Sequence, residues 1–242
     1  MSEFSEVAAT VEREGFAIVP GVIGEGEIAR ANAMLERAEH SDGVRRRGGV
    51  YAIRNLLEAV PGLYELIEAT PVRALAAQVL GAQCFVVRSI LFDKTPEANW
   101  KVAWHQDLSI AVRERRNAEG FGAWSEKAGV THVQPPAEVL EGMLAVRLHL
   151  DASDEANAPL RVLPGSHLRG RLSAEAIARM QEESEIVSCL VPRGGALLMR
   201  PLLLHASSAA RVPFHRRVVH LEFAAGELPA GLAWWSGAKS LS

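Results

Sequence analysis

The chain has 242 residues, of which 48% are hydrophobic and 23% are charged. This length allows one large domain, and the composition is ordinary for a globular protein with a sizeable core. The formal net charge of -3 does not suggest nucleic acid or an anionic membrane as a partner, and no apolar run approaches the length of about 20 residues that a membrane span needs.

The cysteines and the first residues of the chain indicate a compartment. Cys84 and Cys189 are the only cysteines, so a disulfide framework is not expected, and two thiols far apart in the sequence fit a reducing cytoplasm. The N-terminal stretch carries Glu3, Glu6 and Glu12 and no apolar run, so we expect no signal peptide. The sequence therefore favours a cytoplasmic protein.

The N-terminal part of the chain, about 1–81, is predicted to be mainly helical. Its best-signalled helix is the last one, because Thr70 can cap it, Pro71 suits its first position and Gly81 follows its end. A basic run over 45–47 favours a solvated loop, whereas the pattern over 51–58 is ambiguous. Apolar spacing predicts helices over 4–14, 25–40 and about 71–80, a turn over 41–43, and a short strand over 16–19.

After Gly81 the pattern changes to short β-rich runs separated by glycine, proline and polar turns. One helix interrupts them at about 173–183, with Ser173 as its cap. Helices followed by many short strands predict an α+β, mainly β protein with a barrel or jelly roll. We expect a single domain with a core over about 82–225 and a short C-terminal tail. The β-rich runs are 84–93, 100–107, 129–134, 142–151, 159–163, 186–192, 195–199, 202–207 and 216–224.

A His-x-Asp pair is the first candidate for chemistry. His105 and Asp107 are two residues apart, so in an extended backbone both side chains point to the same face. Iron(II) in oxygen-activating enzymes takes this pair together with a second histidine. The pair alone is a weak signal, and the second histidine must come from far along the chain. The late candidates are His205, at the end of an apolar run, His215, in a turn that suits a rigid ligand poorly, and His220, within a strand.

The last predicted strand adds a charged group to one of its faces. Period-two alternation puts Arg216, His220 and Glu222 on the same face. If this face lines the barrel interior, the guanidinium needs an anionic partner, and its planar fork matches a carboxylate. A dicarboxylate co-substrate would supply that partner. Ser207, two residues after His205, would share its face and add a hydroxyl donor.

These motifs together resemble the phytanoyl-CoA dioxygenase family of non-haem iron(II), 2-oxoglutarate-dependent oxygenases. The resemblance covers roughly residues 14–224. Its most specific parts are the Pro-Gly-Ser-His turn and the eleven-residue spacing from the late histidine to the arginine. The motifs are Trp104-His105-x-Asp107, Pro159-Leu-Arg-Val-Leu-Pro-Gly-Ser-His167, His205-x-Ser207 and Arg216.

The resemblance implies a role for each matching residue. Arg216 would clamp the far carboxylate of 2-oxoglutarate with help from Ser207, and Trp124 resembles a family tryptophan that lines the co-substrate pocket. The implied fold is a double-stranded β-helix, a cupin-like jelly roll with the N-terminal helices packed on one side. The implied iron ligands are His105, Asp107 and His205.

The implied activity is the hydroxylation of an unactivated C–H bond in a small organic molecule. The cofactors would be iron(II), 2-oxoglutarate and O2, with release of succinate and CO2. Asp107 stands where related halogenases have a small residue, which favours hydroxylation. Two alternatives remain open: a cupin-type metalloprotein or isomerase without 2-oxoglutarate, which would have no use for Arg216, and a non-catalytic binding jelly roll, which would leave three metal ligands unexplained.

The substrate and the assembly are indicated only weakly. Three arginines lie in otherwise apolar stretches and suggest an anionic, carboxylate-bearing substrate. Segment 108–128 is predicted to be a loop or lid over the site. Trp234 and Trp235 are expected to pack either on the barrel or on a partner chain, so both a monomer and a homodimer are possible. The three arginines are Arg54, Arg88 and Arg147.

Overall fold

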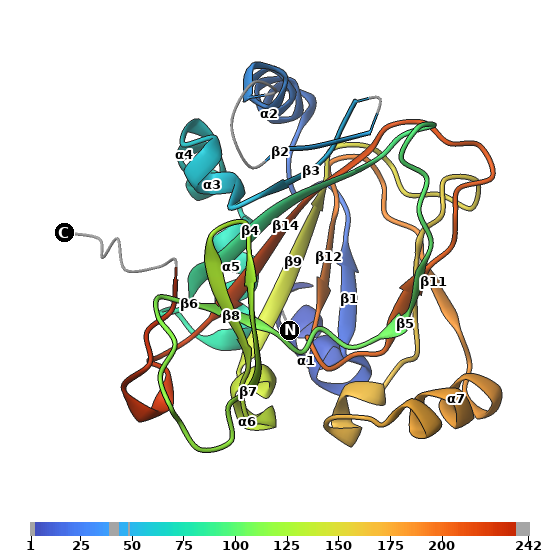
Figure 1. The fold of residues 1–242 in the computed structure, drawn as a ribbon. Coiled ribbons are helices and arrows are strands. Elements are labelled where there is room, and N and C mark those ends of the chain that lie inside the picture. Colours follow the sequence, from blue (N-terminus) through green and yellow to red (C-terminus); the bar gives the residue numbers. More distant parts are fainter. Residues whose placement is uncertain (1–2, 39–43, 48, 236–242) are drawn as a thin grey trace.

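The computed structural model describes residues 3–38, 44–47 and 49–235 (Figure 1). Two antiparallel sheets face each other within these residues and form the jelly roll. In spatial order, the larger sheet contains β1 (Phe16–Val19), β12 (Ala196–Met199), β9 (Met143–His149), β14 (Arg216–Ala224), β4 (Phe85–Lys94), β3 (Gly49–Arg54) and β2 (Val44–Arg47). The smaller sheet contains β11 (Val187–Cys189), β10 (Leu160–Val162), β13 (His205–Ser207) and β5 (Val102–His105).

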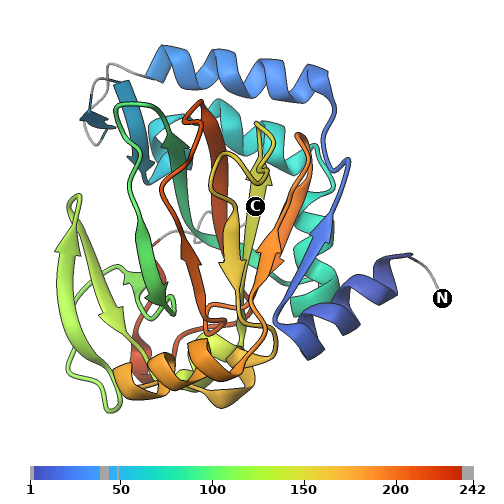
Figure 2. The same ribbon diagram turned by 90° about the vertical axis from the view of Figure 1, so that its right-hand side faces the viewer.

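The helices of the N-terminal part cover the outer face of the larger sheet (Figure 2). None of the helices in the described part of the chain has the length and apolarity to cross a bilayer. The helices are α1 (Glu3–Glu14), α2 (Glu25–Ala38), α3 (Leu56–Ala59), α4 (Gly62–Glu68), α5 (Val72–Leu80), α6 (Ala137–Glu141) and α7 (Ala174–Glu183), with 3-10 turns at η1 (Ser166–Arg169) and η2 (Pro229–Gly231).

The N-terminal part is not as purely helical as predicted. Its strands β1, β2 and β3 join the larger sheet at both edges. The basic run predicted as a solvated loop is strand β2, because it finds a partner in β3. The ambiguous stretch 51–58 divides into the end of β3 and the start of α3. The predicted turn over 41–43 and the last residues of the second predicted helix, 39–40, lie outside the described residues.

The prediction that segment 108–128 is a loop or lid is partly wrong. It contributes two strands to a third antiparallel sheet, in the order β6 (Ile110–Val112), β8 (Val130–Gln134) and β7 (Gly122–Lys127). These strands form because the adjacent run 130–134, predicted as β-rich, pairs with both. The buried Trp234 packs with this sheet, and its indole Nε1 donates to the carbonyl of Gly226 (3.1 Å), so this tryptophan is held within the chain itself.

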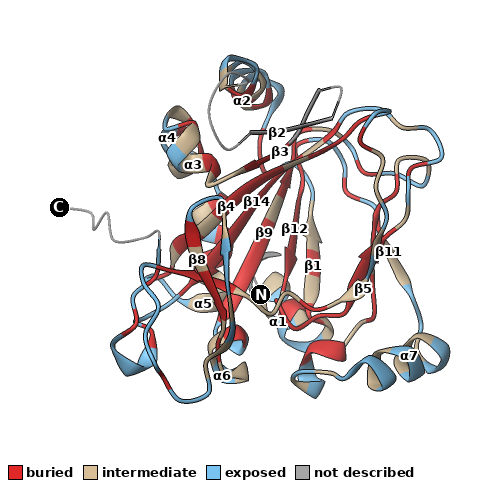
Figure 3. Ribbon diagram, in the orientation of Figure 1, coloured by how far each residue is buried: buried red, intermediate tan, exposed pale blue. Residues whose placement is uncertain are grey.

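The side chains of the central strand β14 point alternately to the two faces of the larger sheet. Val219, Leu221 and Phe223 point outward into the core beneath the helices. The residues between them point inward, between the two sheets, and Figure 3 shows these central strands almost wholly buried. One face of β14 therefore stabilises the fold, and the other is available for a site.

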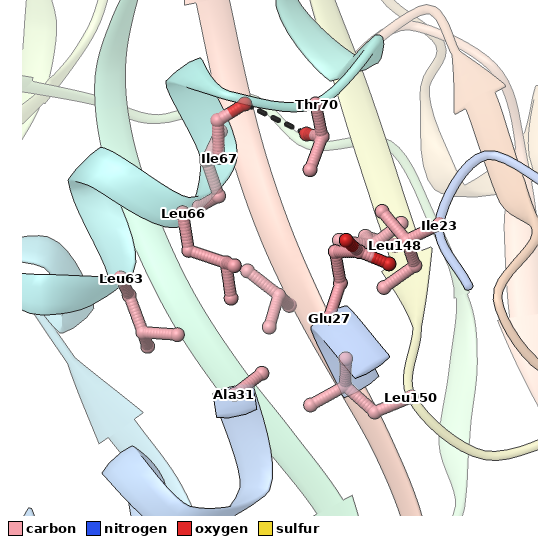
Figure 4. A pocket seen from close by; sticks show the side chains of 10 residues that line it. Ile23, Glu27, Ala31, Leu63, Leu66, Ile67, Thr70, Leu148 and Leu150 are labelled. Carbon is pink, nitrogen blue, oxygen red and sulfur yellow. Dashed lines mark hydrogen bonds between the residues drawn. The ribbon is translucent and has the colours of Figure 1, made fainter. Parts of the chain in front are cut away.

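The helical layer packs closely on the sheet. Between α2 and α4 on one side and β9 and β14 on the other, a gap of only about 10 Å³ remains (Figure 4). Its walls are mostly aliphatic, including Leu63, Leu66 and Leu148, and its polar members bond locally, as Thr70 Oγ1 does when it donates to the carbonyl of Ile67 (2.7 Å). Such a gap is a packing defect and offers no room for a ligand.

One tight turn offers a direct test of this packing. Gly194 has a φ of +77°, and a Cβ there would lie 2.3 Å from the backbone oxygen of Ile23. We expect Gly194→Ala to lower the free energy of unfolding by about 3 kcal/mol, because strain at a positive φ adds to a clash with backbone. Denaturant unfolding measures this change.

The matched control is Gly21→Ala. Gly21 has a φ of +64° with no atom within 4 Å of the added Cβ, so only the backbone strain of about 1 kcal/mol applies. Equal losses in the two variants would contradict the close approach at Gly194.

Candidate metal centre and its cavity

Three potential metal ligands converge where two strands of the smaller sheet pair. His205 on β13 lies opposite His105 at the end of β5, and Asp107 follows two residues later. The Nε2 atom of His105 lies 3.8 Å from Asp107 Oδ1, and that of His205 lies 3.7 Å from Asp107 Oδ2. All three ligand atoms lie within 4.8 Å of one another. Two imidazoles and one carboxylate on one face are the ligand set of a facial triad.

The two histidines are held in the same tautomer. Nδ1 of His105 bonds the carbonyl of Ala103 (2.8 Å), and Nδ1 of His205 bonds the carbonyl of Leu203 (2.9 Å). A carbonyl only accepts, so each Nδ1 carries a proton, and Nε2 is the ring nitrogen that is left to bind a metal. This is how imidazoles are prepared for a metal, with the second ring nitrogen fixed by a hydrogen bond.

Burial and charge give these groups the protonation states that a metal needs. Burial lowers the pKa of His205 to about 4, so its imidazole is neutral at pH 7. Burial acts to raise the pKa of Asp107, but the charges that His205 and the other nearby histidines acquire in acid, together with that of Arg88, outweigh burial and lower the pKa. The site therefore offers neutral imidazole and an ionised carboxylate.

Gln106, between the first two ligands, fixes their loop to the rest of the protein. Its amide nitrogen donates to the carbonyls of Gly170 (2.8 Å) and Leu202 (2.7 Å), and its amide oxygen accepts from the backbone N–H of Leu172 (2.9 Å). Gln106 is the unspecified position of the His-x-Asp pair, so no sequence pattern indicated its role. A buried amide with all three bonds made is a rigid link, so Gln106 positions the ligands on both sides of it.

The Pro-Gly-Ser-His turn supports the other ligand strand. Ser166 Oγ accepts the backbone N–H of Leu204, the residue before the ligand His205 (2.9 Å). His167 does not bond within its own turn, since its Nε2 donates to the carbonyl of Glu12 in α1 (3.1 Å). The turn thus joins the N-terminal helix to the strand that carries a metal ligand.

The three ligands open into a cavity of about 230 Å³ between the two sheets. The strand registers arrange the cavity-facing residues of the larger sheet in rows. From one end, these rows are Lys94 with Arg216, then Phe92 with Val218 and His149, then Arg54, Ile90, His220 and Arg147, then Arg88, Glu222 and Ala145.

The first row, Lys94 and Arg216, faces the smaller sheet and makes one end of the cavity positively charged. Lys94 is 1% exposed, and its ammonium donates to Ser207 Oγ (3.1 Å) and to the carbonyl of Ser208 (2.6 Å). Arg216, buried beside it, donates to the carbonyl of Ala158. Burial, together with the charges of nearby arginines, lowers the pKa of Lys94 to about 7, and burial lowers that of Arg216 to about 10. Two cations without a carboxylate partner among the described residues indicate an anion site.

The third and fourth rows hold a chain of polar contacts. Arg147 Nη1 donates to His220 Nδ1 (3.1 Å), so the imidazole proton is on Nε2, which donates to Glu222 Oε1 (3.3 Å). The same carboxylate oxygen accepts from Arg88 Nη1 (2.9 Å). The histidine is therefore neutral, and Glu222 is the counter-ion of Arg88.

The structure separates the predicted site residues into those that line the cavity and those that do not. His105, Asp107, His205, Ser207, Arg216, Arg88 and Arg147 line it. Arg54 is on the same face of the sheet, in register with Ile90, at the rim. Trp124 is on β7 and packs with the third sheet, where Arg115 lies over its ring (5.6 Å), so it is not among the described residues that line the cavity.

Two cavity residues were missed in the sequence. Lys94 lies an even number of residues after Arg88 on β4 and so points to the same face of the sheet, but the predicted strand ended one residue before it. Trp100, whose ring lies 5.6 Å from the Lys94 ammonium, precedes β5; the predicted run 100–107 included it without indicating a role in the site. Of the other late histidines, His215 bonds the carboxylate of Asp93 (2.7 Å) and is half exposed.

Comparison with known proteins agrees with this geometry. The family model described as Phytanoyl-CoA dioxygenase (PhyH) matches residues 11–218. The ectoine dioxygenase of Bordetella parapertussis is 26% identical over 165 residues, which are 64% of this chain and 47% of that protein. The chain spans about half the length of the curated relatives it matches.

Solved structures share the fold. The non-heme alpha ketoglutarate dependent carbocyclase SnoK from nogalamycin biosynthesis superposes with a TM-score of 0.72 and 16% identity, over 99% of this chain and 88% of that one. EctD from S. alaskensis with 2-oxoglutarate and 5-hydroxyectoine gives a TM-score of 0.69 and 20% identity, over 93% and 76% of the two chains. The predicted jelly-roll fold class is confirmed.

Removal of the Gln106 amide tests its positioning role. We expect Gln106→Leu to lower the affinity for iron(II) about 10-fold, because the loop that carries His105 and Asp107 loses three bonds. Anaerobic calorimetric titration measures the affinity. Gln78→Leu in α5, far from the ligands in the fold, is the control, and a similar loss there would argue against a specific role for Gln106.

A buried histidine behind the site predicts acid sensitivity. Burial lowers the pKa of His132 on β8 to about 4, against 6.5 in the unfolded chain. Between these values the unfolded state binds one more proton, so stability falls as pH falls, by at most about 1.4 kcal/mol per pH unit from this residue. We expect the free energy of unfolding to decrease less between pH 6.5 and 4 in His132→Leu than in the wild type. The value for each protein is taken relative to its own free energy of unfolding at pH 8. Parallel curves would contradict the shifted pKa.

Proposed function

Since the chain belongs to the phytanoyl-CoA dioxygenase family, we propose that it is an iron(II)- and 2-oxoglutarate-dependent oxygenase that hydroxylates a small organic molecule. The observation that carries the proposal is one cavity with a His-Asp-His ligand set and, at its end, two buried cations beside a serine hydroxyl. A metal and a dicarboxylate are the ligands that this combination suits.

The residues present fit iron(II). His105 and His205 offer their Nε2 atoms on rings fixed through Nδ1, and Asp107 offers an ionised carboxylate. Such a mixed nitrogen and oxygen set, with three protein ligands on one face, suits non-haem iron(II). When bound, iron(II) with 2-oxoglutarate and O2 supplies an oxidation coupled to loss of CO2 and formation of succinate.

The co-substrate end of the cavity suits the far carboxylate of 2-oxoglutarate. Arg216 presents a planar fork for two parallel hydrogen bonds, and Lys94 adds a second positive charge. Ser207 bonds the Lys94 ammonium and fixes its position. An arriving carboxylate would remove the cost of burying these cations, so binding of the co-substrate is favoured at this end.

The remaining walls orient the substrate and limit water. Apolar side chains from both sheets, among them Ile90, Phe92, Val102 and Leu160, surround the polar groups of the cavity. Low polarity strengthens each charge interaction inside and keeps the reaction from bulk solvent. The chain's part is therefore to hold three ligands on one face, to fix the co-substrate at its far carboxylate and to present a C–H bond to the metal.

The alternative without 2-oxoglutarate explains less. A cupin-type metalloprotein would use His105, Asp107 and His205 but would bury Lys94 and Arg216 in one row with no anion to bind. That arrangement costs free energy, and nothing in such a function would offset the cost. A non-catalytic binding module would leave the metal ligands unexplained as well.

The test is an anaerobic titration of the iron(II) protein with 2-oxoglutarate, followed by the visible charge-transfer absorption of the chelated keto acid. We expect the band in the wild type and its loss in His205→Ala. Arg216→Ala should need about 100-fold more 2-oxoglutarate to reach half of the full absorption, because the buried pair between the guanidinium and the far carboxylate is lost.

The matched control is Arg217→Ala. Arg217 is the next residue, but it pairs with Asp151 (2.8 Å) away from the cavity. The Arg217→Ala variant should therefore bind 2-oxoglutarate with the same affinity as the wild type. Metal binding with no band in the wild type would overturn the assignment and favour the cupin-type function.

A further inference from the structure

Arg147 is a cavity cation that the proposed chemistry does not use. It lines the cavity from β9, yet it makes no ion pair among the described residues. Its Nη1 donates to a neutral imidazole, its Nε is buried without a hydrogen-bond partner, and its guanidinium lies 5.7 Å from the centre of the Phe92 ring. A half-buried guanidinium whose Nε is fully buried is costly with so little compensation, unless an anion joins it.

The position of this guanidinium is fixed in advance. Arg147 is hydrogen-bonded to His220, His220 to Glu222, and Glu222 to Arg88. Each link has one geometry, because the imidazole accepts at Nδ1 and donates at Nε2. The negative charge of Glu222 is taken up by Arg88 and does not face Arg147 directly. The contacts therefore orient Arg147 without neutralising it.

A charge count of the loaded cavity leaves Arg147 unmatched, and this step rests on the proposed function. Arg88 and Glu222 balance each other, while iron(II) is balanced by Asp107 and the near carboxylate of 2-oxoglutarate. The far carboxylate faces Lys94 and Arg216. These two cations exceed that single negative charge by one at their own end of the cavity. In the other half of the cavity the positive charge of Arg147 remains, so a ligand that carries an anion is needed to complete the site there.

The rim of the cavity carries the same sign of charge. Arg54 stands on β3 in register with Ile90, next to Arg88 on β4. Lys127 is on β7, and its pKa is lowered by burial and by the charges of Arg88 and Arg54. A cationic rim over a low-dielectric cavity attracts anions and repels cations.

We propose that the substrate is a carboxylate-bearing small molecule whose carboxylate pairs with Arg147, in the half of the cavity away from Lys94 and Arg216. The planar fork of the guanidinium matches a carboxylate with two parallel bonds. His220 and Glu222 act as positioning residues for that fork. The positive charges of Arg54 and Lys127 favour the approach of the anion.

The experiment uses the protein loaded with Zn(II) and saturating 2-oxoglutarate, so that nothing turns over. Calorimetry first measures the affinity for 2-oxoglutarate. Saturation-transfer NMR then titrates two isosteric pairs, benzoate with benzamide and butyrate with butyramide. We expect each acid to bind about 10- to 100-fold more tightly than its amide. Arg147→Gln should remove this preference and leave the affinity for 2-oxoglutarate unchanged, and Arg217→Gln should retain both.

Several outcomes would overturn the proposal. Equal binding of acid and amide, or no binding of either acid at about 10 mM, would do so in the wild type alone, so the test does not depend on how the variant folds. Acids that displace 2-oxoglutarate would belong to the Arg216 end. A loss of 2-oxoglutarate affinity in Arg147→Gln would assign Arg147 to the co-substrate. Failure of the wild type to bind 2-oxoglutarate at all would instead refute the proposed function, and calorimetry detects this separately.

Discussion

The antiparallel register of β14 with its neighbours β4 and β9 is the constraint on which the site depends. Because side chains alternate along a strand, the register puts one set of β14 residues under the helices and the other set between the sheets. Arg216, opposite Lys94, and His220, opposite Arg147, become neighbours only through this register. A shift of one residue would exchange the cavity face for the core face and destroy both at once.

The smaller sheet supplies the ligands, and it does so on short strands. β5 and β13 have four and three residues, so they make few ladder bonds of their own. Their stability comes from side chains at either end, through the Gln106 amide and the hydroxyl of Ser166. Buried polar side chains next to the candidate metal centre therefore hold in place the short strands that carry its histidines.

The cavity carries more positive than negative charge, and this has a cost in stability. Lys94, Arg147 and Arg216 are buried or half-buried, and none has a carboxylate partner among the described residues. Proteins rarely bury unpaired cations unless a ligand completes the charge balance. The protein without ligands should therefore be less stable than the loaded one, since ligands that bind only the folded state stabilise it by mass action.

The sequence by itself determined the elements that follow from local patterns. The strand runs predicted from 84 onward outside 108–128, the helix capped by Ser173 and the shared face of Arg216, His220 and Glu222 follow from two-residue or helical periodicity. The candidate metal ligands were indicated by the family resemblance. Only the tertiary structure decided the rest. β2 is a strand because β3 pairs with it, and Trp124 packs with the third sheet because β7 pairs with β8. The contacts of Lys94 with Ser207 and of Arg147 with His220 join residues 113 and 73 positions apart. The first depends on how the two sheets face each other and the second on strand register, and local sequence patterns encode neither.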